Sequence, residues 1–81
     1  MTAPSTADIV DRFSRALEGH LDPERLEGPV RLDNTHTVVI IPVKGKGLIH
    51  AHIGGELDDA GVENILHQIR SVPSLSGLVA G

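Results

Sequence analysis

The spacing of hydrophobic and polar residues predicts two amphipathic helices, one near each end of the chain. In residues 5–19 the apolar positions recur at helical spacing, with charged residues on the opposite face and Ser5 or Thr6 as a cap. Residues 58–71 repeat the pattern behind Asp58, and Pro73 limits that helix by disfavouring helical geometry at the residue before it. The apolar stripes consist of Ile9, Val10, Phe13, Ala16 and Leu17, and of Val62, Ile65, Leu66 and Ile69.

Residues 37–55, between the helices, have the pattern of a β-hairpin. Val38–Val43 is an unbroken apolar run rich in β-branched residues, which fit a pleated surface, and residues 48–53 alternate. Lys44-Gly45-Lys46-Gly47 separates the two runs, and Gly45-Lys46 as the central pair predicts a two-residue type II′ turn. Val43 would then pair with Leu48, and a slip of one residue would swap the faces.

This register gives the hairpin two unlike faces. The wholly apolar face should belong to the core and consists of Val38, Ile40, Pro42, Ile49, Ala51 and Ile53. The second face mixes aliphatic residues with two histidines and consists of Val39, Ile41, Val43, Leu48, His50 and His52. An antiparallel sheet with one face in water normally carries polar residues there. We therefore expect a second layer of this chain, or another chain, to cover the second face.

The remaining segments complete a single small α+β domain over residues 1–81. Asp22-Pro23 predicts one helical turn, and residues 30–32 a short strand with Arg31 pointing outward. The expected fold is a two-layer sandwich of order αβββα, with a three-stranded antiparallel meander and both helices on one face. Met1–Pro4 forms a leader, and residues 72–81 form an apolar tail. The expected core consists of Ile9, Phe13, Leu17, Ile40, Ile49, Ile53, Ile65, Leu66 and Ile69.

Composition narrows the classes of partner. The formal net charge is −4 and Phe13 is the only aromatic residue, so the basic patch and stacking aromatics of nucleic-acid binders are missing. No apolar run approaches the roughly 20 residues that a membrane span needs. The chain has no cysteine, and its first residues lack the pattern of a signal peptide. We expect a cytoplasmic protein, or one inside an assembled particle, that binds neither nucleic acid nor membrane.

His50-Ala51-His52 is the strongest candidate for metal chemistry. Alternation along a strand places both imidazoles on one face, and imidazole suits zinc and other transition metals. A site needs a third ligand, for which Glu56, Asp58 or His36 are the candidates. The alternative is a pair of histidines in a half-buried interface, satisfied by hydrogen bonds.

No pattern of catalytic residues supports an enzyme. The five serines lie in no elbow-like context, and Lys44–Gly47 does not match a phosphate-binding loop. The leading hypothesis is therefore a non-enzymatic interaction or assembly module, acting as a homo-oligomer or as a small subunit of a shell, a virion or a multiprotein enzyme. A metal-binding protein using His50 and His52 is the alternative, and a small regulator of one enzyme is a third possibility.

The apolar tail belongs to the same hypothesis. It either folds back over part of the histidine face or reaches a neighbouring subunit as an added strand or arm. The expected interface thus comprises Val39, Ile41, Val43, Leu48, His50, His52, Leu75, Leu78 and Val79.

Overall fold

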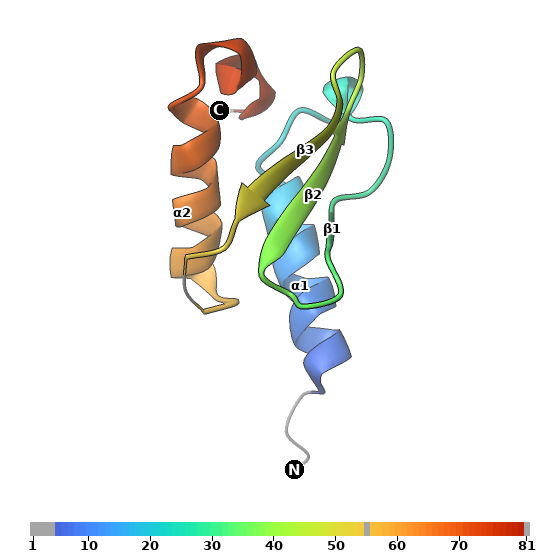
Figure 1. The fold of residues 1–81 in the computed structure, drawn as a ribbon, viewed down its shortest axis with the longest axis vertical. Helices are drawn as coiled ribbons and strands as arrows, with labels where there is room; N and C mark the ends of the chain where they lie inside the picture. The colour runs from blue at the N-terminus through green and yellow to red at the C-terminus, as the bar shows by residue number, and fades with distance from the viewer. Residues whose placement is uncertain (1–4, 55, 81) are drawn as a thin grey trace.

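The computed structural model describes residues 5–54 and 56–80, which form two α-helices, a three-stranded antiparallel sheet and two short 3-10 helices (Figure 1). In chain order the elements are α1 (Thr6–Glu18), η1 (Pro23–Arg25), β1 (Arg31–Leu32), β2 (Val38–Val43), β3 (Gly47–His52), α2 (Asp59–Arg70) and η2 (Pro73–Leu78). The predicted α+β class and the αβββα order are confirmed. The expected leader (residues 1–4), residue 55 at the end of the predicted hairpin segment and residue 81 of the tail lie outside the described residues.

Side-chain caps fix where both helices begin. The Ser5 hydroxyl accepts a hydrogen bond from the Asp8 N–H at 3.2 Å, and the Asp58 carboxylate accepts one from the Gly61 N–H at 3.0 Å. Each cap satisfies a backbone donor that has no partner inside its helix.

No helix in the described ranges is long and apolar enough to cross a membrane.

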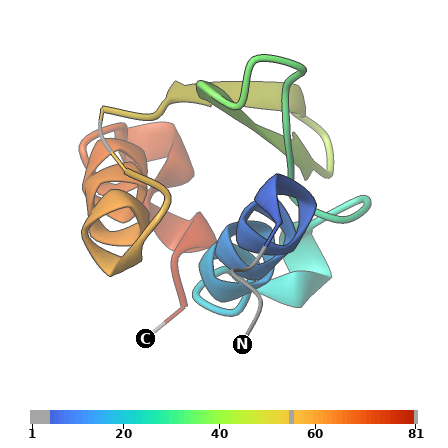
Figure 2. The same cartoon turned by 90° about the horizontal axis from the view of Figure 1, so that it is seen from below.

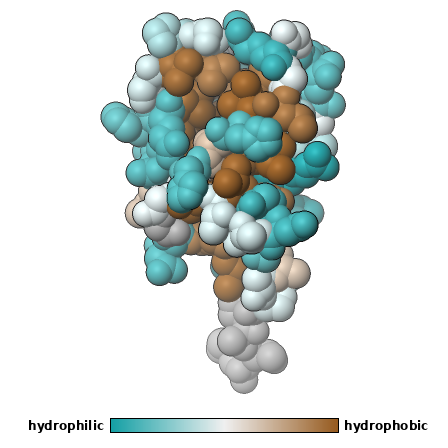
Figure 3. All heavy atoms as spheres, in the orientation of Figure 1, coloured by the Kyte–Doolittle hydropathy of each residue, from teal (hydrophilic) through white to brown (hydrophobic). Residues whose placement is uncertain are grey.

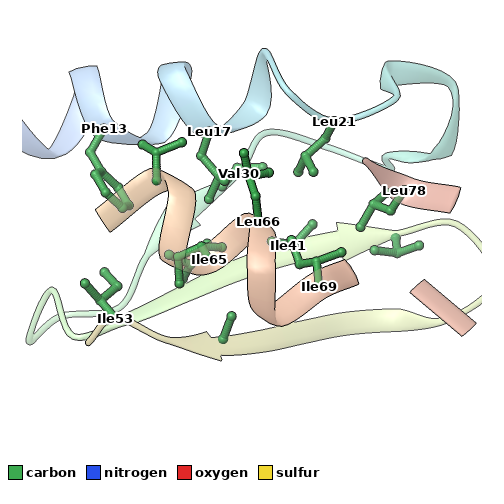
Figure 4. Close-up of a cluster of buried hydrophobic side chains, with 14 residues drawn as sticks. Phe13, Leu17, Leu21, Val30, Ile41, Ile53, Ile65, Leu66, Ile69 and Leu78 are labelled. Atoms are coloured by element: carbon green, nitrogen blue, oxygen red, sulfur yellow. The ribbon is translucent and has the colours of Figure 1, made fainter. Parts of the chain in front are cut away.

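Both helices lie against the same face of the sheet, as Figure 2 shows. One cluster of buried side chains from α1, α2 and the inner sheet face fills the space between the layers (Figure 4). Of the residues expected in the core, six are buried: Phe13, Leu17, Ile53, Ile65, Leu66 and Ile69. Ile9 and Ile49 are half-buried, whereas Ile40 lies on the opposite face of the sheet and was wrongly placed.

The hairpin turn differs from the prediction by one residue. Val43 pairs with Gly47 instead of Leu48, so the loop contains three residues. The Lys46 N–H donates to the Val43 carbonyl at 3.1 Å, which makes Gly45 the third residue of the turn. Its φ of +77° suits a type II turn, and Gly47 follows with a φ of +78°. A second glycine able to adopt this conformation favours the longer loop over the type II′ turn.

This shift exchanges the faces of β2 but leaves those of β3 as predicted. Val39 and Ile41 are fully buried and Val43 is 5% exposed, so all three point toward the helices. Their assignment to an uncovered face was wrong. Val38, Ile40 and Pro42 point outward instead, beside the outward residues of β3, which are Leu48, His50 and His52.

The apolar tail folds back onto its own chain. Leu78 is 2% exposed, and its carbonyl accepts a hydrogen bond from the Asp22 N–H at 2.8 Å. Val79 forms a β-bridge with Leu21 just beyond the end of α1. Of the two alternatives for the tail, folding back is the one observed, but Leu78 and Val79 pack at the end of α1 and not over the histidine face as expected. Leu75 is half-buried beside the edge of β3.

Candidate functional site: the outer face of the sheet

The outer face of the sheet is built from rows of side chains that cross the strands. Ile40 lies between Arg31 on β1 and His50 on β3, because these residues are paired in the sheet. Val38 is opposite His52, and Pro42 is opposite Leu48. Residues of an antiparallel pair that face each other lie close enough for their side chains to interact. The rows therefore bring an aliphatic strip on β2 against a strip on β3 with two imidazoles.

Aliphatic side chains on this face remain accessible because neither helix covers it (Figure 2). Val38, Ile40 and Pro42 are half-buried by their neighbours within the sheet, whereas Leu48 is 52% exposed. Figure 3 shows hydrophobic residues gathered over β2 and β3, with hydrophilic side chains among them. Such a surface is unusual for the wet side of an antiparallel sheet.

The charge on the outer face is opposite in sign to that of the whole chain. None of the three strands contains an aspartate or glutamate, although the formal net charge is −4. Arg31 is exposed on β1, and Lys44 and Lys46 are exposed at the hairpin tip. The carboxylates lie on the helices and in the connecting segments. The outer face is thus apolar with cationic and imidazole groups around it.

Asp33 organises the loop that leads into this face. Its carboxylate accepts hydrogen bonds from the Thr35 hydroxyl at 2.7 Å and from the N–H groups of Thr37 and Val38 at 3.0 and 3.1 Å. The Thr35 hydroxyl and these backbone donors lower the pKa of Asp33, since they stabilise the ionised form, and burial opposes them in part. Within this loop, His36 adopts a φ of +58°, which is rare for a residue other than glycine.

The histidine pair lies on one face, as the strand alternation predicts. His50 and His52 are both exposed on the outer side of β3. Across residues 5–54 and 56–80 the structure brings together no group of three or more histidine, aspartate or glutamate side chains that could hold a metal. The suggested third ligands His36, Glu56 and Asp58 are not gathered around the pair. Metal binding by His50 and His52 therefore stays a prediction, and these two side chains are the ligands identified for it.

Four of the five serine hydroxyls are hydrogen-bonded to local backbone groups. Ser14, Ser71 and Ser76 donate to the carbonyls of Val10, His67 and Pro73, and the Ser5 hydroxyl caps α1. These bonds are intra-helical or intra-turn contacts that compete with activation by a base. A hollow of about 460 Å³ lies between α1 and the segment before α2, where Ile9, Arg12 and Asp58 are among its lining residues. It contains no serine or histidine.

Comparisons with protein-family models, with curated proteins and with solved structures find no match to this chain.

Sequence reasoning correctly placed Leu48, His50 and His52 on an uncovered face, but it missed Val38, Ile40 and Pro42. A signal for these three residues was present in the turn. Gly47 as well as Gly45 can adopt a positive φ, and a three-residue loop that contains Gly45 and is followed by Gly47 reverses the faces of β2 relative to the predicted turn. The choice between the two loops depends on which face of β2 the helices bury.

Proposed function

We propose that this chain is a non-enzymatic protein–protein interaction module that works as a subunit of an assembly, in the cytoplasm or within an assembled particle. Its binding surface is the outer face of the sheet, defined by Val38, Ile40, Pro42, Leu48, His50 and His52. One observation carries this proposal: the face is aliphatic, and both helices pack against the opposite side.

Burial of this face would supply the binding energy. Removing apolar surface from water contributes roughly 25 cal/mol per Å², so a partner that covers this strip gains several kcal/mol before ordering costs. Exposed apolar patches larger than a few hundred Å² usually mark interaction sites. Arg31, His50 and His52 add polar groups around the strip, an arrangement typical of the rim of an interface.

Self-association is the first form of assembly to test. Ile40 lies at the centre of the strip, so Ile40→Asp would bury a carboxylate in any contact that uses this face. Arg31 and His50, opposite it on the neighbouring strands, would offset only part of that desolvation cost. We expect sedimentation equilibrium of the wild type to show concentration-dependent association and the variant to sediment as a monomer. Far-UV circular dichroism should show that the variant keeps its fold.

Ala60→Asp is the matched control, because Ala60 is exposed in the first turn of α2, where an acidic residue favours the helix. It should associate like the wild type. A wild-type chain that stays monomeric at millimolar concentration would exclude self-assembly, and assembly with a different protein would then be the form of the proposal to test. Equal association of the wild type and Ile40→Asp would overturn the assignment to the outer face.

A further inference from the structure

β3 leaves unpaired backbone groups along one edge of the sheet. The strand order is β1-β2-β3, so only one side of β3 has a neighbouring strand. The Ile53 N–H donates to the Thr37 carbonyl on that side at 2.8 Å. Because successive residues of an antiparallel strand direct their backbone groups to opposite sides, Leu48, His50 and His52 direct theirs to the open edge.

A side chain from α2 occupies one backbone group along this edge. Gln68 donates its side-chain amide to the His52 carbonyl at 2.8 Å. In the described part of the chain no other element bonds to this side of β3, so the N–H and C=O groups of Leu48 and His50 remain available. The open stretch contains no proline, lysine or bulge, the features that usually protect an edge strand.

A hollow of about 100 Å³ lies beside this edge, between β3, the end of α2 and η2. Most of its lining is apolar: Ile49, Ala51, Ile69, Val72 and Leu75. Val72 is 42% exposed, and it and Leu48 are the large hydrophobic side chains most accessible to solvent in the described residues. Hydrogen-bonding groups and an apolar depression therefore lie side by side.

We infer that this edge accepts an extended segment of another protein as a fourth strand, with aliphatic side chains directed into the hollow and carboxylates directed to the outer face. The inference rests on the proposed function as a protein-binding module, and it adds a second surface and names the chemistry of its partner. Main-chain hydrogen bonds give such strand addition its affinity, and pockets for alternate side chains give it specificity.

The two faces of β3 determine which side chains of the incoming strand should be aliphatic and which should be acidic. Residues beside Ile49 would point toward α2, into the hollow, and should be aliphatic. Residues beside Leu48 and His50 would point to the outer face, on the strand that leads from the hairpin tip with its exposed Lys44 and Lys46. Neither the strands nor the lining of the hollow includes a carboxylate, so an acidic residue on the partner is the electrostatic complement.

A second copy of β3 fits this edge poorly. In Figure 2, α2 extends sideways beyond the β3 edge of the sheet, so two copies paired through β3 would bring their α2 helices into the same space. Such pairing would also bring the lysines and histidines of two hairpins together without any acidic partner. A single strand placed over the flank of α2 avoids both problems.

The test uses a short capped peptide of alternating aspartate and valine as the probe. Titration of the chain should give saturable amide shifts in NMR spectra at Leu48 and His50. In a strand that pairs antiparallel to β3, the residues opposite Leu48 and His50 are the aspartates. N-methylation of the aspartates then removes the peptide N–H groups that face β3 and should weaken binding about tenfold or more, since each net hydrogen bond contributes about 0.5–1.5 kcal/mol. N-methylation of the valines, whose N–H groups face away, should leave the affinity within about twofold, because no hydrogen bond to β3 is lost.

Variants of the chain separate this site from the outer face. Val72→Asp places a charge at the rim of the hollow and should also weaken binding about tenfold, because an aliphatic side chain would then meet an unpaired carboxylate. Ala60→Asp should bind the peptide like the wild type, and so should Ile40→Ala, which removes aliphatic surface from the outer face without adding a charge opposite His50. A failure of the proposal for the outer face would therefore not affect this result.

Three outcomes would overturn the inference: no saturable shift at millimolar peptide, equal affinity of the two N-methylated peptides, or wild-type binding by Val72→Asp. Equal binding of a peptide with lysine in place of aspartate would contradict the inference that the partner segment is acidic.

Discussion

Single residues fix the local geometry next to the outer face. Asp33 is the clearest case, because one carboxylate bonds to the Thr35 hydroxyl and to the N–H groups of Thr37 and Val38. These contacts support a loop in which His36 adopts a positive φ, an arrangement that costs about 1 kcal/mol for a residue other than glycine. The strand that carries the outer face thus begins at a loop that Asp33 holds in place.

Acidic pH should destabilise the fold in part through Asp33. Its folded pKa is lowered, so the unfolded chain binds the proton more readily, and the stabilisation present above about pH 4 is lost as the pH falls through the folded pKa. Asp33→Asn keeps an acceptor oxygen but does not titrate, so its denaturation midpoint should depend less on pH between about 5 and 2. Parallel pH profiles of the two proteins would contradict this role.

At the scale of elements, the hairpin loop decides which residues of β2 meet the helices. Gly45 and Gly47 both have positive φ, and an added Cβ at either position would meet no atom within 4 Å. The requirement for glycine is therefore conformational. A loop one residue shorter or longer would turn the opposite face of β2 toward α1 and α2.

Gly47→Ala should lower the free energy of unfolding by about 1–2 kcal/mol, the cost of a left-handed conformation for a residue with a Cβ. Gly19→Ala is the matched control. Gly19 follows α1 with a φ of −63°, and a Cβ there would make ordinary contacts at 3.5 Å. That substitution should be neutral or stabilising by up to about 1 kcal/mol, and urea denaturation of both variants would measure the difference. Similar effects of the two changes would argue against the three-residue loop.

At the scale of the whole molecule, two helices on one side and open sheet on the other give adjacent residues of β2 opposite roles. Ile41 is fully buried against α1 and α2, whereas Ile40 points outward and is half-buried. The outer face adjoins the open edge of β3, whereas the hollow beside that edge lies on the helix side of the sheet.

Ile41→Ala should cost about 2–5 kcal/mol of unfolding free energy, the range for truncating a buried aliphatic side chain. Ile40→Ala should cost less than about 1.5 kcal/mol, since its neighbours bury it only in part. Chemical denaturation of the monomer at low concentration is the measurement. If Ile40→Ala were the more damaging change, the register of the sheet would be wrong.

The sequence by itself determined both α-helices, the turn η1 and the three strands, but it did not predict η2 in the tail. Ser5 and Asp58 cap the helices where a short polar side chain precedes a run of helical periodicity, and β-branched residues in 38–43 favour a strand wherever it packs. It also determined the outward side of β3, because alternation of polar and apolar residues in 48–53 leaves one choice. These properties depend on neighbours within a few residues along the chain.

Only the tertiary structure decided the register of β2 and the position of the tail. Every residue from Val38 to Val43 is apolar, so either face of that strand can be buried, and the loop and the helices together select one. The tail likewise lacks a pattern that names its neighbour, and its pairing with Leu21 and Asp22 depends on where α1 ends in space. A uniformly apolar segment carries no information about which side faces water, so packing against distant parts of the chain supplies it.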